Sequence, residues 1–179
     1  MESRRLILRP SEFSDCALFA EWESREEVSE FFTMDEGRGY ETIVKEFINY
    51  SDDPTKEMYT IISKEENKPI GRIYLSRIDK CEDSLDLTRI YIADPQKRNK
   101  GLGEESLRLI LEYAFLSLHM ERVTIDHFRE NKHAANLYKK IGFTDEGVMR
   151  HSGKKNGKYV DLCLMSMLRA EYYEKLHDQ

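Results

Sequence analysis

The 179-residue chain lacks several features that would place it in other classes of protein. It has only three cysteines, Cys16, Cys81 and Cys163, and their spacing fits neither a disulfide framework nor a zinc site. No apolar run approaches the roughly 20 residues that span a bilayer. The N-terminus has no long apolar region of the signal-peptide type. These absences predict a cytoplasmic protein with no membrane partner and no bound metal.

Positive charge is also in deficit, since 34 acidic residues outnumber 28 lysines and arginines and the net charge is −6. Proteins that bind nucleic acid generally are basic, so we expect no nucleic-acid partner. Hydrophobic residues make up 40% of the chain and charged residues 35%, which is typical of a folded globular protein. The length suits one domain over residues 1–179.

Hydrophobic periodicity predicts alternating strands and helices along the chain. We expect strands over 5–9, 57–63, 69–78, 85–93, 122–128, 143–149 and 159–168. We expect helices over 15–22, capped by Ser14, and over 26–32, 40–51, 104–119 and 131–141. A basic turn over 150–158 would join the last two strands. This order predicts an α/β protein with a mixed sheet.

The loop at 94–103, between a predicted strand and a predicted helix, has the composition of a phosphate-binding segment. It combines the basic and glycine residues Lys97, Arg98, Lys100, Gly101 and Gly103. The first turn of a helix has N–H groups without partners and a positive dipole end. Glycines let a ligand come close to the backbone. The loop therefore has the groups that a phosphate requires.

This loop differs from the common nucleotide-binding loops. No Lys-Ser or Lys-Thr pair follows Gly103, so it is not a P-loop. A dinucleotide fingerprint would need glycine or alanine where Ser106 stands. A kinase-like nucleotide-binding protein is therefore disfavoured. On the loop alone, a phosphate site and an ordinary solvated turn remain equal alternatives.

Three segments together resemble the GNAT superfamily of N-acetyltransferases, and the resemblance covers nearly the whole chain. The segments are Arg98-x-x-Gly101-x-Gly103, then Asn131-x-x-Ala134-x-x-x-Tyr138-x-x-x-Gly142-Phe143, then Glu146-Gly147-x-Met149-Arg150 with Asn156-Gly157-Lys158-Tyr159-x-Asp161 and Met165-x-Met167-Leu168. The third resembles the subgroup that contains ribosomal-protein N-terminal acetyltransferases and spermidine acetyltransferases.

The resemblance implies an α/β (α+β) fold with a mixed, mostly antiparallel sheet of about seven strands and flanking helices. Two parallel strands would splay apart, and acetyl-CoA would bind in the gap as co-substrate. Backbone groups of 91–93 would pair with the pantetheine arm, 98–104 would hold the pyrophosphate, and Asn131 would contact the arm. The implied cofactor-binding residues are Tyr91, Ile92, Ala93, Arg98, Asn99, Lys100, Gly101, Leu102, Gly103, Glu104, Asn131, Ala134 and Tyr138.

Tyr138 is the first catalytic candidate. The resemblance implies that it lies near the thioester sulfur and protonates the departing thiolate. A phenol is protonated at neutral pH and can donate that proton. The alternative is a tyrosine that only packs in the core.

Asp86 is the candidate general base. Many GNAT relatives place a glutamate on the strand before the loop, where this chain has Thr88, and a threonine cannot take a proton at neutral pH. Asp86 lies two residues earlier on the same strand face and could act through a water. The alternatives are that Asp86 is only a solvated carboxylate, that Glu82 or Asp83 serves, or that no base is needed.

The leading interpretation is an acetyl-CoA-dependent N-acetyltransferase in which a primary amine attacks the thioester directly in a ternary complex. The acceptor stays open between a polyamine, another small amine and a peptide N-terminus. Asp35 and Glu36 lie in the loop where the resemblance would place acceptor contacts, and His127 could face the acceptor. Candidate walls of the acceptor site are Trp22, Phe31, Phe32 and Tyr40. A CoA-binding sensor with little catalysis is the alternative function, and a homodimer is compatible with the resemblance.

Overall fold

The computed structural model describes residues 1–33 and 38–177. Its strands form a seven-stranded sheet in the order β1-β2-β3-β4-β5-β7-β6. The strands are β1 (Leu6–Pro10), β2 (Glu57–Ser63), β3 (Lys68–Asp79), β4 (Ser84–Ile92), β5 (Arg122–Phe128), β6 (Thr144–Lys155) and β7 (Lys158–Leu168). Neighbours pair antiparallel except β4 and β5, which are parallel. The predicted sheet type and strand number are confirmed.

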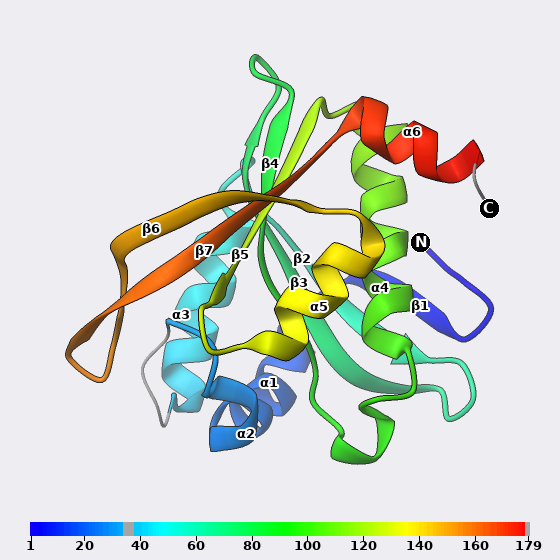
Figure 1. Cartoon of the computed structure of the whole chain (residues 1–179). Helices are drawn as coiled ribbons and strands as arrows, with labels where there is room; N and C mark the ends of the chain where they lie inside the picture. Colours follow the sequence, from blue (N-terminus) through cyan, green and yellow to red (C-terminus); the bar gives the residue numbers. More distant parts are fainter. Residues whose placement is uncertain (34–37, 178–179) are drawn as a thin grey trace.

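Helices cover both faces of this sheet. The helices are α1 (Cys16–Glu23), α2 (Glu26–Ser29), α3 (Tyr40–Ser51), α4 (Leu102–Glu112), α5 (Lys132–Ile141) and α6 (Arg169–His177). Helices α1 to α3 lie together on one side, and α4 and α5 lie on the other (Figure 1). The β6–β7 hairpin extends from the sheet (Figure 1), and Lys155 near its tip donates to the carbonyls of Ser29 at 2.5 Å and Phe32 at 3.2 Å, next to α2.

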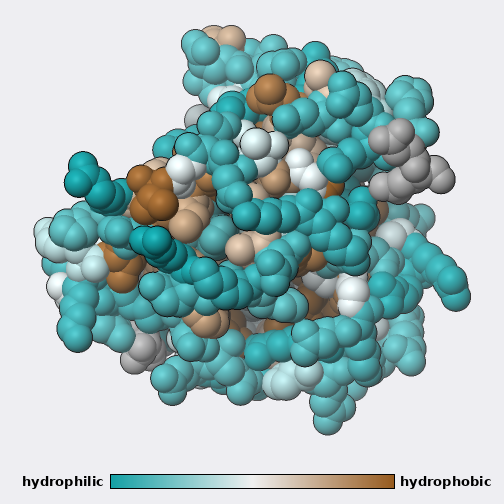
Figure 2. Space-filling view, in the orientation of Figure 1, coloured by the Kyte–Doolittle hydropathy of each residue, from teal (hydrophilic) through white to brown (hydrophobic). Residues whose placement is uncertain are grey.

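Each face has its own hydrophobic core. Leu107, Ile110 and Leu111 recur at helical spacing on α4 and are fully buried in the larger core, against the sheet and α5. Phe19 of α1 and Ile43 of α3 are fully buried in the smaller core on the opposite face. The sheet is thus covered on both faces, while the surface in Figure 2 is largely hydrophilic with hydrophobic residues in small separate groups.

The parallel pair β4–β5 separates partway along its length. Pairing runs from Ser84 opposite Arg122 to Leu87 opposite Ile125 and then stops, although β4 continues to Ile92 and β5 to Phe128. On its other side, β4 has an irregularity at Thr88, because Tyr74 pairs with Arg89 whereas Leu75 pairs with Leu87. Such a bulge adds an unpaired residue and bends the strand. A gap therefore opens between the carboxyl ends of β4 and β5.

Three helix starts, those of α1, α4 and α5, differ from the prediction by one or two residues. Helix α4 begins at Leu102, not at 104, because Gly101 takes the left-handed conformation (φ 76°) that sets the helix N-cap. Ser14 does not cap α1, because a 3₁₀ turn, Phe13–Asp15, precedes that helix. In this turn Asp15 accepts the Glu12 N–H at 2.9 Å.

The basic segment 150–158 was expected to be a turn, and this is wrong. Strand β6 runs on to Lys155, and the turn is only Asn156-Gly157, with φ of 48° and 77°. Positive φ at both central residues is the tight hairpin geometry that Asn-Gly favours. Helix α6 was not predicted at all. Within the described residues, none of the helices is long and apolar enough to cross a membrane.

Candidate functional site

A cavity of about 330 Å³ lies where β4 and β5 diverge. Its walls come from α2 and the residues after it, from β4 and β5, from the loop before α4, and from α5. Eight predicted cofactor residues line it, namely Tyr91, Ile92, Arg98, Asn99, Gly103, Asn131, Ala134 and Tyr138. The other five lie outside its wall, namely Ala93, Lys100, Gly101, Leu102 and Glu104.

The backbone at the end of β4 offers hydrogen-bonding groups to this gap. The Ala93 N–H donates to the Ile70 carbonyl at 2.8 Å and therefore faces β3. Because successive residues of a strand turn their backbone groups to opposite sides, Ile90 and Ile92 turn theirs toward the gap. An extended ligand with amide groups could pair with this edge as an added strand does.

Arg98 fixes the loop to the end of β4. Its Nε donates to the Ile92 carbonyl at 2.9 Å, and its Nη2 donates to the Ala93 carbonyl at 3.3 Å. The Arg98 guanidinium is thus engaged with the backbone, and the prediction that residues 98–104 hold the pyrophosphate rests on the N–H groups of the loop. These two hydrogen bonds of Arg98 position the rest of the loop beside the cavity.

The start of α4 has the features of an anion site. Gly101 makes no side-chain cap, so the first N–H groups of α4 lack that partner. Gly103 lines the cavity and a Cβ there would meet nothing within 4 Å. Glu104 points its charge to Lys140 at 2.5 Å and Arg108 at 3.0 Å, and these contacts keep the pKa of its carboxyl low. Leu102 is buried in the core.

Asn131 and Tyr138 come from α5. Asn131 is the N-cap of that helix, where its Oδ1 accepts the Ala134 N–H at 3.0 Å. Tyr138 lies about two turns later on the buried face of α5, and its ring packs between His127 and Phe143, with both centroids 6.0 Å away. By capping α5, Asn131 fixes the start of the helix that carries the Tyr138 phenol to the cavity wall.

The environment of Tyr138 keeps its phenol protonated. Burial raises the pKa of Tyr138 well above its usual range, and the negative charge of Asp126 raises it further. Beside it, His127 Nδ1 lies 2.9 Å from the Phe128 carbonyl, and its buried Nε2 has no hydrogen-bond partner. A protonated phenol at neutral pH can donate to a leaving group.

Asp86 lies outside the cavity wall. Its carboxylate pairs with Arg77 and accepts a hydrogen bond from Thr124. The carboxylates that do line the cavity, among the described residues, are those of Asp126 on β5 and Glu27 on α2. The structure does not bring Asp86 to the site, and its role as a base stays a prediction without support from this geometry.

The other end of the cavity is formed by residues from α2 onward. Phe31 and Phe32, expected as acceptor walls, do line it, whereas Trp22 and Tyr40 do not. The predicted contacts Asp35 and Glu36 lie outside the described residues. No group of three metal-ligating side chains occurs in residues 1–33 and 38–177.

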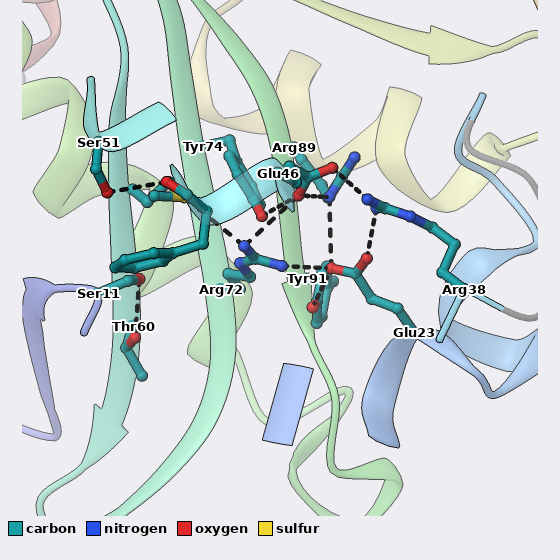
Figure 3. Close-up of polar contacts among 12 residues, drawn as sticks. Ser11, Glu23, Arg38, Glu46, Ser51, Thr60, Arg72, Tyr74, Arg89 and Tyr91 are labelled. Atoms are coloured by element: carbon teal, nitrogen blue, oxygen red, sulfur yellow. Dashed lines mark hydrogen bonds and ion pairs between the residues drawn. The ribbon is translucent and has the colours of Figure 1, made fainter. Parts of the chain in front are cut away.

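A buried charge network lies behind this wall, on the face covered by α1 to α3 (Figure 3). Glu23 of α1 is fully buried and receives Arg38 at 2.7 Å, Arg72 at 2.8 Å and the Tyr91 hydroxyl at 2.9 Å. The Arg72 guanidinium also stacks on Phe19, with its carbon 3.9 Å from the ring centroid. These contacts join α1, β3 and β4.

Glu46 of α3 extends the network toward the cavity. It receives Arg38 at 2.5 Å and Arg89 at 3.3 Å, and Arg89 lines the cavity. Burial alone would raise the pKa of Glu46, but Arg89, Arg38 and Arg72 outweigh it and hold that pKa below its usual range. The network therefore fixes helices α1 and α3 to β4, the strand that carries Tyr91.

Sequence reasoning missed Asp126 and Arg89 as lining residues. One signal was available for Asp126: it is a polar position at the end of the predicted strand 122–128. Whether Asp126 lines a cavity depends on where β4 and β5 separate, and no local sequence pattern shows that point. Arg89 follows the bulge at Thr88, and a bulge shifts which side chains face each side of the sheet.

Known proteins resemble this chain along most of its length. A family model described as an acetyltransferase (GNAT) domain matches residues 5–144. The uncharacterized N-acetyltransferase p20 from Bacillus licheniformis is 26% identical over 178 residues, which cover 95% of this chain and 96% of that protein. Spermidine N(1)-acetyltransferase from Vibrio cholerae is 22% identical over 171 residues, covering 96% and 97%.

A solved structure gives the same picture of the fold. The spermidine N-acetyltransferase from Vibrio cholerae, in complex with CoA and spermine, has a TM-score of 0.86 to this chain at 21% identity. The match covers 96% of this chain and 99% of that one. At this identity the likeness shows that the two chains share a fold.

Proposed function

This chain belongs to the GNAT acetyltransferase family and is an acyltransferase, and on that premise we propose that it transfers the acetyl group of acetyl-CoA to a primary amine. The observation that supports this most is the gap between β4 and β5. It brings the start of α4, the backbone edge of β4 beyond its pairing with β5, and the Tyr138 phenol to one cavity. A phosphate, an amide-rich arm and a thiolate need these three kinds of group.

The donor would occupy the α4 and α5 side of the gap. Its pyrophosphate would meet the N–H groups near Gly103, where the helix dipole favours an anion. Its pantetheine amides would pair with the backbone of Ile90 and Ile92. The neighbouring N–H groups would also polarise the thioester carbonyl as negative charge develops on its oxygen.

The chemical step would be direct attack of the amine on the thioester in a ternary complex. Holding both substrates together supplies much of the rate through proximity and orientation. Tyr138 would protonate the sulfur as the C–S bond breaks. No covalent enzyme intermediate is needed, and among the described residues that line the cavity there is no cysteine.

The acceptor would enter from the α2 side, between Phe31, Phe32 and Glu27. The relatives named as spermidine acetyltransferases favour a small cationic amine. Peptide N-termini are kept as a second class, because an α-amino group has a pKa near 8 and loses its proton more readily than a side-chain amine. A cytoplasmic setting and a homodimer complete the proposal.

A screen of acetyl-CoA consumption tests this function. Release of the CoA thiol would be followed with a thiol reagent over polyamines, short peptides and aminoglycosides, each against an amine-free blank. Amine-dependent release with any class is the expected result, and it identifies the acceptor. Tight acetyl-CoA binding by calorimetry, with no release across the whole panel, would favour the CoA-binding sensor instead.

A further inference from the structure

Two polar side chains approach the gap from opposite faces of β5. His127 and Ile125 point to the side of α4 and α5, since His127 packs on Tyr138 and Ile125 belongs to the core there. Successive side chains of a strand point to opposite faces. Asp126 therefore points to the other side, where Phe32 packs on Tyr91 in the smaller core.

Asp126 stands at the point where the strands separate. The last pair of β4 and β5 joins Leu87 to Ile125, so Asp126 is the first residue of β5 beyond the ladder. It lines the cavity together with Tyr138. The two side chains thus share one cavity, with the phenol on the donor face of the sheet and the carboxylate on the acceptor face.

The carboxylate of Asp126 has no hydrogen-bond donor or ion-pair partner within the part of the chain that the structure describes. Asp86, one residue pair back along the same face, is by contrast held by Arg77 and Thr124. A carboxylate aimed into a cavity without a partner can accept a proton or hold a cation.

The charged groups around Asp126 come from several elements. Burial disfavours the charged form of Asp126 most, while His127 of β5 and Arg77 at the end of β3 favour it. The Asp126 charge in turn raises the pKa of Tyr138 on α5. Glu27 of α2 lines the same cavity. Although Asp126 is open to the cavity, the protein around it disfavours the charge, and the net result is a pKa above its usual range. Such a carboxylate is a better proton acceptor than an ordinary one.

We propose that Asp126 is the general base of this site, receiving the acceptor ammonium and taking its proton before attack. The inference rests on the proposed function, and it replaces Asp86 in that role. The carboxylates of Asp126 and Glu27, beside Phe31 and Phe32, suit a cationic amine with an apolar or aromatic-contacting chain.

The proton balance closes with Asp126 and Tyr138 together. The ammonium gives one proton to Asp126, which passes it to solvent, and the neutral nitrogen forms the N–C bond to the thioester carbon. When the C–S bond breaks, its electron pair goes to sulfur, which takes the Tyr138 proton. The nitrogen loses its second proton as the amide forms, and that proton restores the phenol. The products are the amide, the CoA thiol and one proton.

The test is a pH series of initial rates of CoA-thiol release, with spermidine and with a short peptide bearing a free N-terminus. Asp126→Asn should lower kcat/KM for the amine by about 10²-fold at neutral pH. The deficit should shrink as pH rises toward the pKa of the amine, because solution then supplies neutral amine. Acetyl-CoA affinity by calorimetry should stay unchanged, and Asp126→Glu should restore part of the rate.

Three further variants make the result decisive. Asp145→Asn is the inert control, since Asp145 lies on β6 and pairs at the surface with Lys139 at 2.6 Å. Asp86→Asn and His127→Gln are the competing bases. A neutral-pH loss in either of these with full activity in Asp126→Asn overturns the proposal, as does a deficit in Asp126→Asn that is the same at every pH.

Failure of the proposed function has a different signature. The wild-type chain would then release no CoA thiol with either amine, and both the function and the base would be withdrawn. An active wild type with an equally active Asp126→Asn would remove only the base.

Discussion

The two sides of β4 handle charge in opposite ways. On the side of α1 and α3, Glu23 is fully buried yet bonded to three arginines and a tyrosine. In the gap beside β5, the Asp126 carboxylate and the buried Nε2 of His127 have no described hydrogen-bond partner. Buried polar groups are normally paired, because an unpaired one costs about 1–3 kcal/mol.

The paired charges around Glu23 stabilise the fold, whereas the unpaired groups in the cavity are available to a substrate. A paired charge holds elements together and has no free lone pair for a ligand. The unpaired, buried Nε2 of His127 is retained at a cost in stability, whereas Asp126 is exposed to the cavity and keeps its carboxylate available to a ligand. The two regions share Tyr91, whose hydroxyl serves the network while its strand borders the cavity.

Breaking the network should produce the largest effect on stability. Glu23→Gln removes the nearer carboxylate of the fully buried Arg72 and leaves it only Glu46 at 3.5 Å. We expect a loss of about 3–5 kcal/mol in the free energy of unfolding by urea titration. The matched control is Glu21→Gln on the same helix, where an exposed pair with Arg25 is worth about 0.5 kcal/mol or less. Equal losses in the two variants would show that the network is not a stabilising element.

The same network predicts how stability depends on pH. The pKa of Glu46 is lowered in the folded protein, so its contribution is fully present above the ordinary glutamate value. It is lost as pH falls through the lowered folded value. An acid titration of wild type and Glu46→Gln should therefore converge at low pH.

Removing the proton donor should produce the largest effect on chemistry. Tyr138→Phe keeps the ring between His127 and Phe143 but removes the hydroxyl, so we expect turnover to fall about 10²-fold with acetyl-CoA affinity nearly unchanged. Steady-state kinetics and calorimetry measure the two. Tyr113→Phe is the control, because that phenol bonds Glu57 outside the cavity. Undiminished turnover in Tyr138→Phe would exclude the donor role.

Local patterns predicted much of the fold. The helix at 40–51 and the strand at 122–128 have the predicted bounds, because helical spacing and apolar alternation are clear there. The turn at 150–158 was wrong because its lysines and arginines resemble a solvated loop, while the informative pair is Asn156-Gly157. Helix α6 has no buried residue and only a weak pattern, so it left no signal.

The site was only partly predictable, for a physical reason. Tyr138 and Gly103 belong to motifs that are local in sequence, and both line the cavity. Asp126 gains its position from the divergence of two strands that are about 40 residues apart in the chain. The prediction of Asp86 as the base used only its position along one strand. Its actual partners, Arg77 and Thr124, come from the neighbouring strands, which the sequence of that strand does not show.

A smaller effect is expected at Gly103, where stability and acetyl-CoA binding should change in opposite directions. Gly103→Ala should raise the free energy of unfolding by about 0.5–1 kcal/mol, because alanine restricts the unfolded chain and its methyl meets nothing within 4 Å. The same methyl would occupy the wall where the pyrophosphate is proposed to approach, so calorimetry should show weaker acetyl-CoA binding. Gly39→Ala also meets nothing within 4 Å but lies off the cavity wall, and it should leave acetyl-CoA affinity unchanged.

The smallest expected effect concerns the stability cost of Asp126 itself. Its pKa is raised in the folded protein, so the unfolded chain loses that proton first as pH rises. Stability is therefore lost between the ordinary aspartate value and the raised folded value, and it stays lower at neutral pH. Asp126→Asn should remove this loss and melt slightly higher at pH 7, with the gain vanishing below pH of about 3.8.

A matched variant shows whether that gain belongs to the unpaired carboxylate. Asp86→Asn removes a charge that Arg77 and Thr124 already hold, so it should give no gain in thermal stability at any pH. If both variants melt higher by the same amount, the gain reflects only the reduction of the net charge from −6 to −5. The contrast between paired and unpaired carboxylates would then have no energetic basis at this site.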